Sequence, residues 1–177
     1  MQSGKNRDEL IEYIMQNREG FYRLAFSYVK NEATAMDMVQ DAIVKALDKV
    51  WTLRNPEYIK TWFYRILINT CLMHLRESKK FTLVEYNEEI MAEPEFVLEE
   101  LDGISAEELQ EAIGMLETNL KTIIFLRFYE EMSLQEIAQT TKTNINTVKT
   151  RLYRAIDILR DNLCDYEQGG KEDEKSN

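Results

Sequence analysis

Apolar side chains recur at helical spacing along most of the chain, and this periodicity predicts an all-α protein. In the N-terminal half, one or two helices end near the Lys30–Asn31 turn, a further helix covers residues 36–50, and another runs from residue 59 to about 78. A break separates the last two at Arg54–Asn55–Pro56, since the residue before a proline is disfavoured in helical geometry. The apolar stripes of the first two segments are Leu10, Ile11, Ile14, Leu24, Ala25 and Tyr28, then Met36, Val39, Ile43, Leu47 and Val50.

The helix predicted over residues 59–78 is apolar on most of its sides, so we expect neighbours on both flanks. One row of positions along it is polar instead, at spacings of four, four and seven residues. We call this row the polar seam. It consists of Thr61, Arg65, Asn69 and Arg76, and Lys79 and Lys80 extend it beyond the helix.

Residues 133–154 have the pattern of two short helices joined by a tight turn, a helix-turn-helix. Ser133 and Glu136 form a capping box that begins the first helix. The turn falls at residues 141–144, and Asn144 is the candidate N-cap of the second helix. The predicted apolar stripe of that second helix is Ile145, Val148, Leu152, Ile156 and Leu159.

The side of the second helix opposite this stripe is polar and basic. It carries Asn146, Thr150 and Arg154, and residues 139–155 contain four basic side chains and no acidic one. Such a helix suits the major groove of DNA, where it can neutralise phosphates and contact base edges. The alternative is an ordinary solvated cationic face on a packing helix.

A second capping box, Ser105 with Glu108, predicts the start of the C-terminal module. The chain thus divides into two small helical domains, residues 1–82 and 105–164, a linker over residues 83–104, and a polar tail, residues 165–177, that we expect to be disordered. Helical periodicity fades from residue 81 to 103, where acidic residues are dense. The apolar residues among them either dock onto a partner or pack transiently on the chain's own modules.

The formal net charge of −10 opposes nucleic-acid binding only when the chain is taken as a whole. Residues 1–80 carry 13 basic and 10 acidic side chains, and residues 121–160 carry 7 and 4. Residues 81–120 carry 12 acidic side chains and no basic one, and residues 161–177 carry 6 acidic and 2 basic. Two mildly basic modules are therefore separated by an acidic connector, and the local field decides where DNA approaches.

The 177 residues contain few candidates for a metal-binding or catalytic site. Cys71 and Cys164 have no metal-binding spacing and His74 is the only histidine, so we expect neither a metal site nor a disulfide framework. We expect Cys71 to pack as a small apolar side chain. No glycine-rich phosphate loop or nucleophile triad is found. With no apolar run of membrane-spanning length and no secretion signal, the sequence predicts a soluble, cytoplasmic protein that is not an enzyme and needs no cofactor or small-molecule substrate.

The segments FYRLAFSYV, DMVQDAIVKAL and TWFYRILINTCLMHLR, the acidic linker and the final NTVKTRLYRA together resemble the extracytoplasmic-function sigma factors of bacterial RNA polymerase over about residues 8–164. The resemblance implies a region-2 domain that binds the polymerase clamp coiled coil and the melted minus-10 element. It also implies a region-4 domain that contacts the polymerase flap and reads the minus-35 duplex. An anti-sigma factor, often anchored in the membrane, is the further partner that it implies.

The resemblance also assigns roles to individual residues. The polymerase-binding residues would be Asp37, Gln40, Asp41 and Lys45. The minus-10 residues would be the loop candidates Arg54, Asn55 and Tyr58 and the polar seam Thr61, Arg65, Asn69 and Arg76. The minus-35 residues would be Asn146, Thr147, Lys149, Thr150, Arg151, Tyr153 and Arg154. Arg65 could equally serve as a structural ion-pair partner, and Trp62 and Phe63 are expected in the core.

Two positions depart from the family pattern. Leu116 is followed by Glu117 where the family commonly has proline, and Asn146 stands where it has glycine. Both departures concern how helices of the C-terminal domain begin. Two other classes of function remain open to the sequence: a helix-turn-helix regulator that binds duplex operators by itself as a dimer, and a helical adaptor without a role in DNA binding.

Overall fold

The computed structural model describes the backbone of residues 2–78 and 105–173, and the side chains of residues 5–78, 105 and 107–163. The linker predicted at 83–104 and the lysines at 79 and 80 lie outside these residues. Within the described ranges every regular element is helical, which confirms the all-α prediction.

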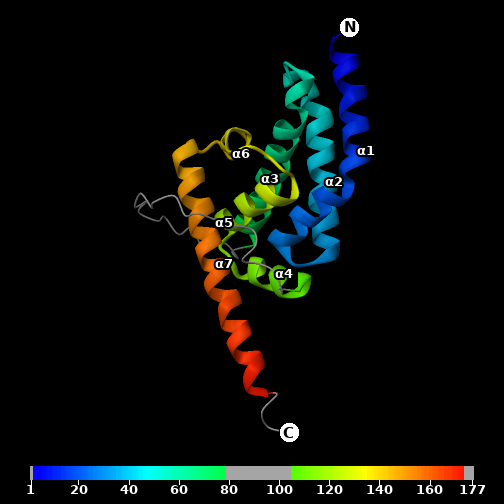
Figure 1. The fold of residues 1–177 in the computed structure, drawn as a ribbon. Helices are drawn as coiled ribbons and strands as arrows, with labels where there is room; N and C mark the ends of the chain where they lie inside the picture. Colours follow the sequence, from blue (N-terminus) through cyan, green and yellow to red (C-terminus); the bar gives the residue numbers. More distant parts are fainter. Residues whose placement is uncertain (1, 79–104, 174–177) are drawn as a thin grey trace.

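Three long helices form the N-terminal half: α1 (Gln2–Val29), α2 (Glu32–Lys49) and α3 (Ile59–Glu77). They lie side by side (Figure 1), and each packs on the other two. Lys30 adopts positive φ between α1 and α2, and the Asn31 side chain caps α2 by accepting a hydrogen bond from the Thr34 amide. Two short 3-10 turns, η1 (Val50–Thr52) and η2 (Pro56–Tyr58), occupy the predicted break before α3.

Aromatic rings fill the space between α1 and α3. Phe21 and Phe63 are fully buried with ring centroids 4.3 Å apart, and Tyr64 meets Phe21 edge-on at 5.4 Å. Such pairs stabilise a core beyond the burial of their area, by roughly 0.5–1.5 kcal/mol each. Cys71 is also fully buried, as predicted, and burial raises the pKa of its thiol to about 12.

Shorter helices form the C-terminal half. They are α4 (Ala106–Met115), α5 (Thr118–Ile124), a π-helical turn η4 (Phe125–Tyr129), α6 (Leu134–Thr141) and α7 (Ile145–Asp173). Both predicted capping boxes are present, at Ser105 with Glu108 and at Ser133 with Glu136. α5 and α6 pack against α7, which runs along one side of the molecule (Figure 1).

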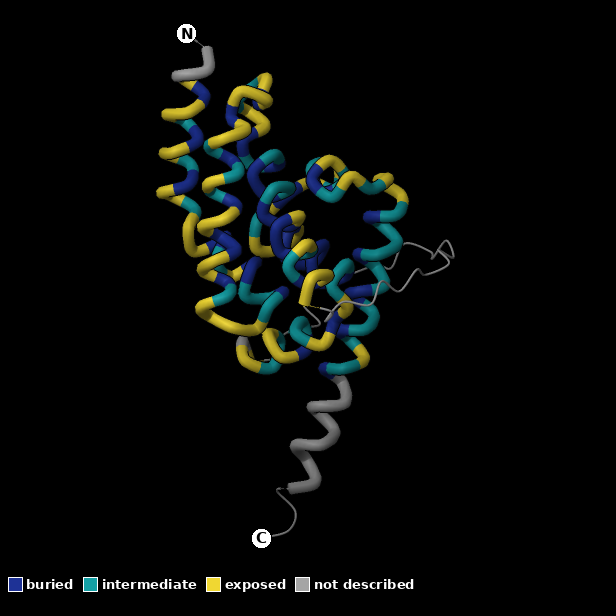
Figure 2. Tube along the Cα trace, turned by 180° about the vertical axis from the view of Figure 1, so that it is seen from behind, coloured by how far each residue is buried: buried dark blue, intermediate teal, exposed yellow. Residues whose placement is uncertain are grey.

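The two halves share one hydrophobic core. α6 packs on α3, and α5 packs on α1. Buried residues therefore continue from one half to the other, while the outer sides of α1 and α2 are largely exposed (Figure 2). This contact between the halves has no counterpart in the sequence prediction.

Some periodicity-based predictions were wrong in detail. Ile11, Met36 and Ile145 were placed on buried stripes, yet their exposed fractions are 39%, 55% and 40%. On α2 the buried face is instead built largely from small side chains, because close helix approach favours them. That face consists of Ala35, Met38, Val39, Ala42 and Ala46.

The predicted tail also differs from the structure, because α7 continues to Asp173. Residues 165–173 contain no proline, so a long helix can propagate through them despite their polarity and the two poor helix formers Gly169 and Gly170. No described helix is long and apolar enough to cross a membrane.

Candidate nucleic-acid interface

The outer face of α2 carries most of the predicted polymerase-binding residues. Asp37, Gln40 and Asp41 are exposed there. Lys45 is different: it is half-buried, and its ammonium donates a hydrogen bond to the Thr70 hydroxyl of α3 at 3.2 Å. Lys45 therefore ties α2 to α3 in this structure.

Two apolar side chains are exposed on the same face, although Met36 was predicted to be buried and Val44 was not singled out. Met36 and Val44 are 55% and 57% exposed, and they lie four residues before and after Gln40, on its side of the helix. The face thus combines carboxylates, an amide and exposed apolar side chains. Such a mixture is typical of protein-binding surfaces. The sequence offered one sign of these exposed residues: the helix has more apolar residues than a single buried stripe can hold.

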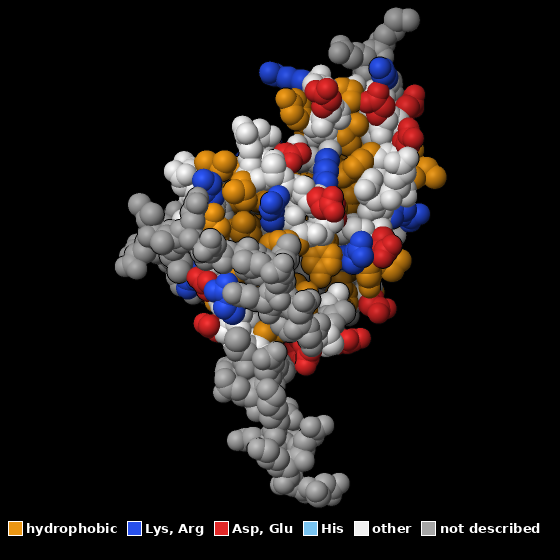
Figure 3. Space-filling model, viewed as in Figure 1, with side chains coloured by type: hydrophobic (Ala, Val, Ile, Leu, Met, Phe, Trp, Pro, Cys, Tyr) orange, Lys and Arg blue, Asp and Glu red, His pale blue; other side chains and the backbone are white. Residues whose placement is uncertain are grey.

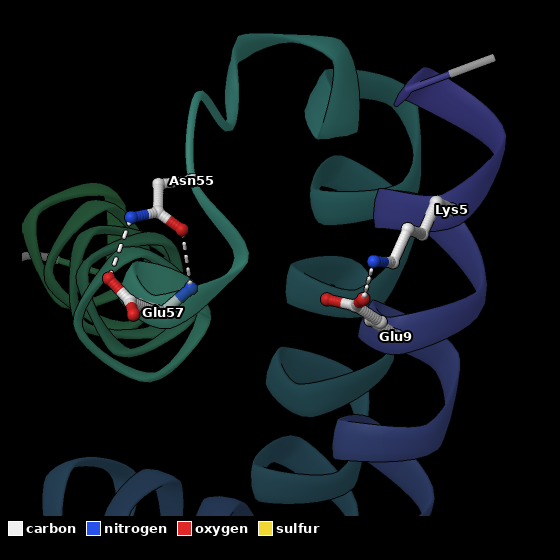
Figure 4. Close-up of polar contacts among 4 residues, drawn as sticks. All are labelled: Lys5, Glu9, Asn55 and Glu57. Carbon is white, nitrogen blue, oxygen red and sulfur yellow. Dashed lines mark hydrogen bonds and ion pairs between the residues drawn. The ribbon is translucent and has the colours of Figure 1, made fainter.

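The loop before α3 is fixed by its own side chains. The Asn55 amide accepts a hydrogen bond from the Glu57 backbone N–H at 3.1 Å and donates to the Glu57 carboxylate at 2.8 Å (Figure 4). On the other side of the loop, buried Asn6 donates to the Leu53 carbonyl at 2.8 Å. Nearby, Lys5 and Glu9 form an ordinary exposed ion pair along α1, also shown in Figure 4.

These contacts separate the loop candidates by role. Asn55 acts as the N-cap of η2, so its amide already has partners. Arg54 and Tyr58 are exposed, Tyr58 by 54%. Trp51, which the sequence analysis did not single out, is 74% exposed at the other end of the loop. A loop held by these hydrogen bonds and flanked by two exposed aromatic rings is suited to stacking with unpaired bases.

The polar seam on α3 is not uniform. Thr61 is buried, and its hydroxyl donates to the Tyr58 carbonyl at 3.2 Å. Arg65 is half-buried, and its guanidinium donates to the Gln139 carbonyl of α6. Asn69 and Arg76, farther along α3, are exposed. In this arrangement only the C-terminal part of the seam is open.

The helix-turn-helix is shaped by local capping. Ser133 accepts from the Glu136 amide while the Glu136 carboxylate accepts from the Ser133 amide at 2.8 Å. Donation by the Ser133 amide and hydroxyl lowers the pKa of Glu136. Lys142 ends α6 in the left-handed region, with φ 53°.

The second helix of the motif begins where the sequence predicts. Asn144 accepts from the amide of Asn146 at 2.8 Å, so an asparagine in place of the family's glycine is compatible with a capped start. Glu117 likewise begins α5 in an extended conformation, ψ 150°, where the family has proline.

The predicted duplex-facing residues lie on the first three turns of α7, opposite or beside its buried stripe. Val148 and Leu152 are buried beneath them. Asn146 is exposed, and its carbonyl accepts the Thr150 hydroxyl at 3.0 Å. The remaining predicted residues are half-buried: Thr147, Lys149, Thr150, Arg151, Tyr153 and Arg154.

Charge on the face seen in Figure 3 is mixed. Lys and Arg side chains are scattered among acidic and apolar ones and do not form one continuous basic patch. Phosphate neutralisation supplies most non-specific affinity for DNA, and this face presents no continuous basic surface for it. No group of side chains that could hold a metal ion occurs among the described residues.

Comparison with known proteins identifies both halves. Residues 13–81 match the family model "Sigma-70 region 2", and residues 106–159 match "Sigma-70, region 4". The RNA polymerase sigma factor SigV of Bacillus subtilis is 48% identical over 152 residues, covering 85% of this chain and 89% of SigV. The ECF RNA polymerase sigma factor SigW of the same organism is 26% identical, covering 90% and 91%.

Solved structures have the same fold. The sigma factor RpoE in complex with the anti-sigma factor NepR from Bartonella quintana gives a TM-score of 0.65 at 20% identity, covering 86% of this chain and 94% of RpoE. CnrH in complex with the cytosolic domain of CnrY gives 0.65 at 19%, covering 92% and 95%. With regions 2 and 4 both matched and a 48% identical relative, the chain belongs to the sigma-70 family of RNA polymerase sigma factors, in its extracytoplasmic-function group.

Proposed function

We propose that this chain is a dissociable subunit of bacterial RNA polymerase that directs initiation to a particular set of promoters. The observation that carries the proposal is the presence of both sigma regions in one chain. Exposed polar side chains on α2 (Asp37, Gln40 and Asp41) and at the start of α7 (Asn146) support it. The site of action is the cytoplasm, where promoters and core polymerase are found.

In the proposed mechanism, the outer face of α2 binds the clamp coiled coil of core polymerase, with region 4 near the flap. Asp37, Gln40 and Asp41 supply the polar contacts, and Met36 and Val44 add apolar area beside them. Region 4 then places the N-terminal part of α7 in the major groove of the minus-35 element. Arg154 and Thr150 contact base edges there, and Lys149 contacts a phosphate.

Strand opening takes place at the other domain. Unstacking a base costs on the order of a few kcal/mol, and stacking on an aromatic ring returns about 1–3 kcal/mol per base. Tyr58 and Arg54 of the loop and Asn69 and Arg76 of α3 form the exposed surface that receives the non-template strand of the minus-10 element. The two hydrogen bonds between Asn55 and Glu57 hold this loop in place for the strand.

We further propose that an anti-sigma factor controls the chain. One of the similar solved structures, RpoE, is a complex with the anti-sigma factor NepR. The other, CnrH, is a complex with the cytosolic domain of CnrY. An inhibitor that covers the α2 face or the α7 face would block polymerase or promoter binding.

Run-off transcription tests this function. Core polymerase is incubated with a promoter library in the presence and absence of the chain, and the 5′ ends of the transcripts are sequenced. We expect start sites that depend on the chain and share two upstream elements. A library without any chain-dependent start site would contradict the proposal, and tight sequence-specific binding to duplex without polymerase would favour a stand-alone regulator.

A further inference from the structure

A side chain from the first turns of α1 anchors the loop that precedes α3. Asn6 is 4% exposed, and its Nδ2 donates a hydrogen bond to the Leu53 carbonyl at 2.8 Å, across 47 positions of the sequence. α1 also packs on both 3-10 turns at the ends of this loop (Figure 4). The hydrogen bond is buried, so the Leu53 carbonyl would be left unpaired if it lost this donor.

The Asn6 amide is only half satisfied. Because the Leu53 carbonyl can only accept a hydrogen bond, the Nδ2 of the amide must face it. The Oδ1 on the other side of the amide is buried and has no hydrogen-bond partner in the described part of the chain. A buried acceptor without a partner lowers stability. Stability alone would therefore favour an apolar side chain at position 6, and what the asparagine adds is its hydrogen bond to Leu53.

The Leu53 carbonyl belongs to the peptide group that leads into Arg54. Because a peptide group is planar, holding its oxygen fixes the direction in which the chain continues to the Arg54 Cα. Asn55, the next residue, is fixed as well, because its side chain accepts from the Glu57 amide and its carbonyl accepts from the Tyr58 amide at 3.1 Å. Exposed Arg54 therefore stands between two fixed points of the backbone.

Asn6 lies outside the part of the chain that matches a family model. The match to Sigma-70 region 2 begins at residue 13, and the turns of α1 that contain Asn6 precede it. The match therefore assigns no role to Asn6, and the contacts of its side chain alone indicate what it does.

We propose that Asn6 is a positioning residue for strand capture. Its hydrogen bond to Leu53 sets the orientation of Arg54, so that the loop is already arranged when the unpaired non-template strand arrives. Such preorganisation avoids the loss of affinity that ordering a loop during binding would cause. The role in strand capture rests on the proposed function, whereas the anchoring of the loop does not.

Hydrogen exchange in the free chain tests the anchoring of the loop. Asn6→Leu keeps the approximate size of the side chain and removes both the donor and the unpaired Oδ1. Amide exchange in peptides from residues 50–58, followed by mass spectrometry, should become roughly three- to tenfold faster, the effect of one net hydrogen bond. Peptides from α7 should exchange at the wild-type rate. Asn6→Ala removes the same donor without a branched side chain and should give the same result if leucine does not fit.

A swap of Lys5 and Glu9 is the matched control. These two residues form an ion pair at 3.7 Å on the same turns of α1 as Asn6. The double variant Lys5→Glu, Glu9→Lys keeps the net charge and the possibility of the pair, and it leaves the Asn6 amide in place. It should alter neither amide exchange in residues 50–58 nor promoter opening.

A double-mutant cycle with Arg54 tests the role in strand capture. Holoenzyme containing each variant is placed on a promoter recovered by run-off transcription, and opening is measured as permanganate reactivity of unpaired thymines. Asn6→Leu should lower the ratio of open to closed promoter roughly three- to tenfold, with polymerase affinity and minus-35 protection retained. If Asn6 acts through Arg54, the two losses are not additive, and Asn6→Leu should change little in the Arg54→Ala background.

Asn69 supplies the reference for additivity. It is exposed on α3, away from the peptide group that Asn6 holds, so the losses caused by Asn6→Leu and Asn69→Ala should multiply. A general loss of stability would instead lower opening to the same degree in the Arg54→Ala and Asn69→Ala backgrounds.

The outcomes separate the two parts of the proposal. Wild-type exchange of residues 50–58 in both Asn6 variants would overturn the anchoring, whether or not the chain supports transcription. Faster exchange with unchanged opening, or with equal losses in the two backgrounds, would overturn the role in strand capture. Absence of any chain-dependent start site would overturn the proposed function and that role with it, but not the anchoring. Faster exchange together with coupling to Arg54→Ala alone would support both parts.

Discussion

The guanidinium of Arg65 on α3 is hydrogen-bonded to the backbone carbonyl of Gln139 on α6. One residue of the polar seam is therefore bound by the helix-turn-helix of the other domain. Two elements that we propose to contact DNA thus meet in this structure, through residues 74 positions apart in sequence. Substitutions that affect only one of the two elements can separate their contributions to promoter binding.

Arg154→Ala tests duplex reading by region 4. If Arg154 makes a bidentate contact to guanine, its loss should weaken binding of the holoenzyme to promoter duplex by about 1–3 kcal/mol and relax preference at one base pair. Arg160→Ala is the matched control, because Arg160 lies on the same helix near Asp157, at 3.4 Å. Equal losses on promoter and random duplex would instead identify Arg154 as a phosphate contact.

Asn69→Ala tests strand capture by region 2. Asn69 is exposed on α3, so we expect its substitution to change the free energy of unfolding by less than about 0.5 kcal/mol. Fewer promoters should be open at equilibrium, measured as permanganate reactivity of unpaired thymines, while minus-35 duplex protection is retained. If both signals fell together, Asn69 would have no separate role in the opened strand.

Glu136→Gln tests the capping box that begins α6. The pKa of Glu136 is lowered by donation from Ser133, so its carboxylate stabilises the folded state fully above the pKa of free glutamate, 4.5. This contribution is lost as pH falls through the lowered pKa of the folded state. The melting temperature of the wild type should therefore exceed that of Glu136→Gln at neutral pH, and the difference should shrink at acid pH.

The same box can be tested at Ser133. Ser133→Ala should cost about 1 kcal/mol of stability at neutral pH, the usual effect of losing an N-cap. A pH-independent difference between the wild type and Glu136→Gln would show that the carboxylate contributes nothing through its charge.

Lys121→Met tests the buried ammonium at the contact between α1 and α5. Burial, and secondarily the charge of Lys30, lower the pKa of Lys121 from 10.5 to about 8. Between these values the unfolded chain holds the proton more tightly, so wild-type stability should rise with pH relative to the variant. Unfolding by denaturant at several pH values measures this difference.

Local signals in the sequence were reliable for helix starts. Ser133, Ser105 and Asn144 were each identified as N-caps, because capping depends on side chains within three residues of one another. Periodicity was less reliable for burial. It favoured large apolar residues such as Met36, whereas the close packing of α2 selects alanines and leaves Met36 exposed.

The contact between the domains could not be predicted from the sequence. Its hydrogen bonds join a hydroxyl to a hydroxyl, as in Tyr28 with Thr122, or a cation to a backbone carbonyl, as in Arg65 with Gln139. Backbone carbonyls are present at every residue and leave no pattern in the sequence. The linker, which would limit the possible placements, carries charge but no periodicity.

We propose that one chain reads a duplex element and captures an opened strand at the same promoter. Footprinting of the holoenzyme on a promoter recovered by run-off transcription tests it directly. We expect two signals that both require the chain: protection of an upstream duplex that is lost in Arg154→Ala, and unpaired thymines downstream that are lost in Asn69→Ala. Upstream protection by the chain alone, with no opening when polymerase is added, would contradict the claim.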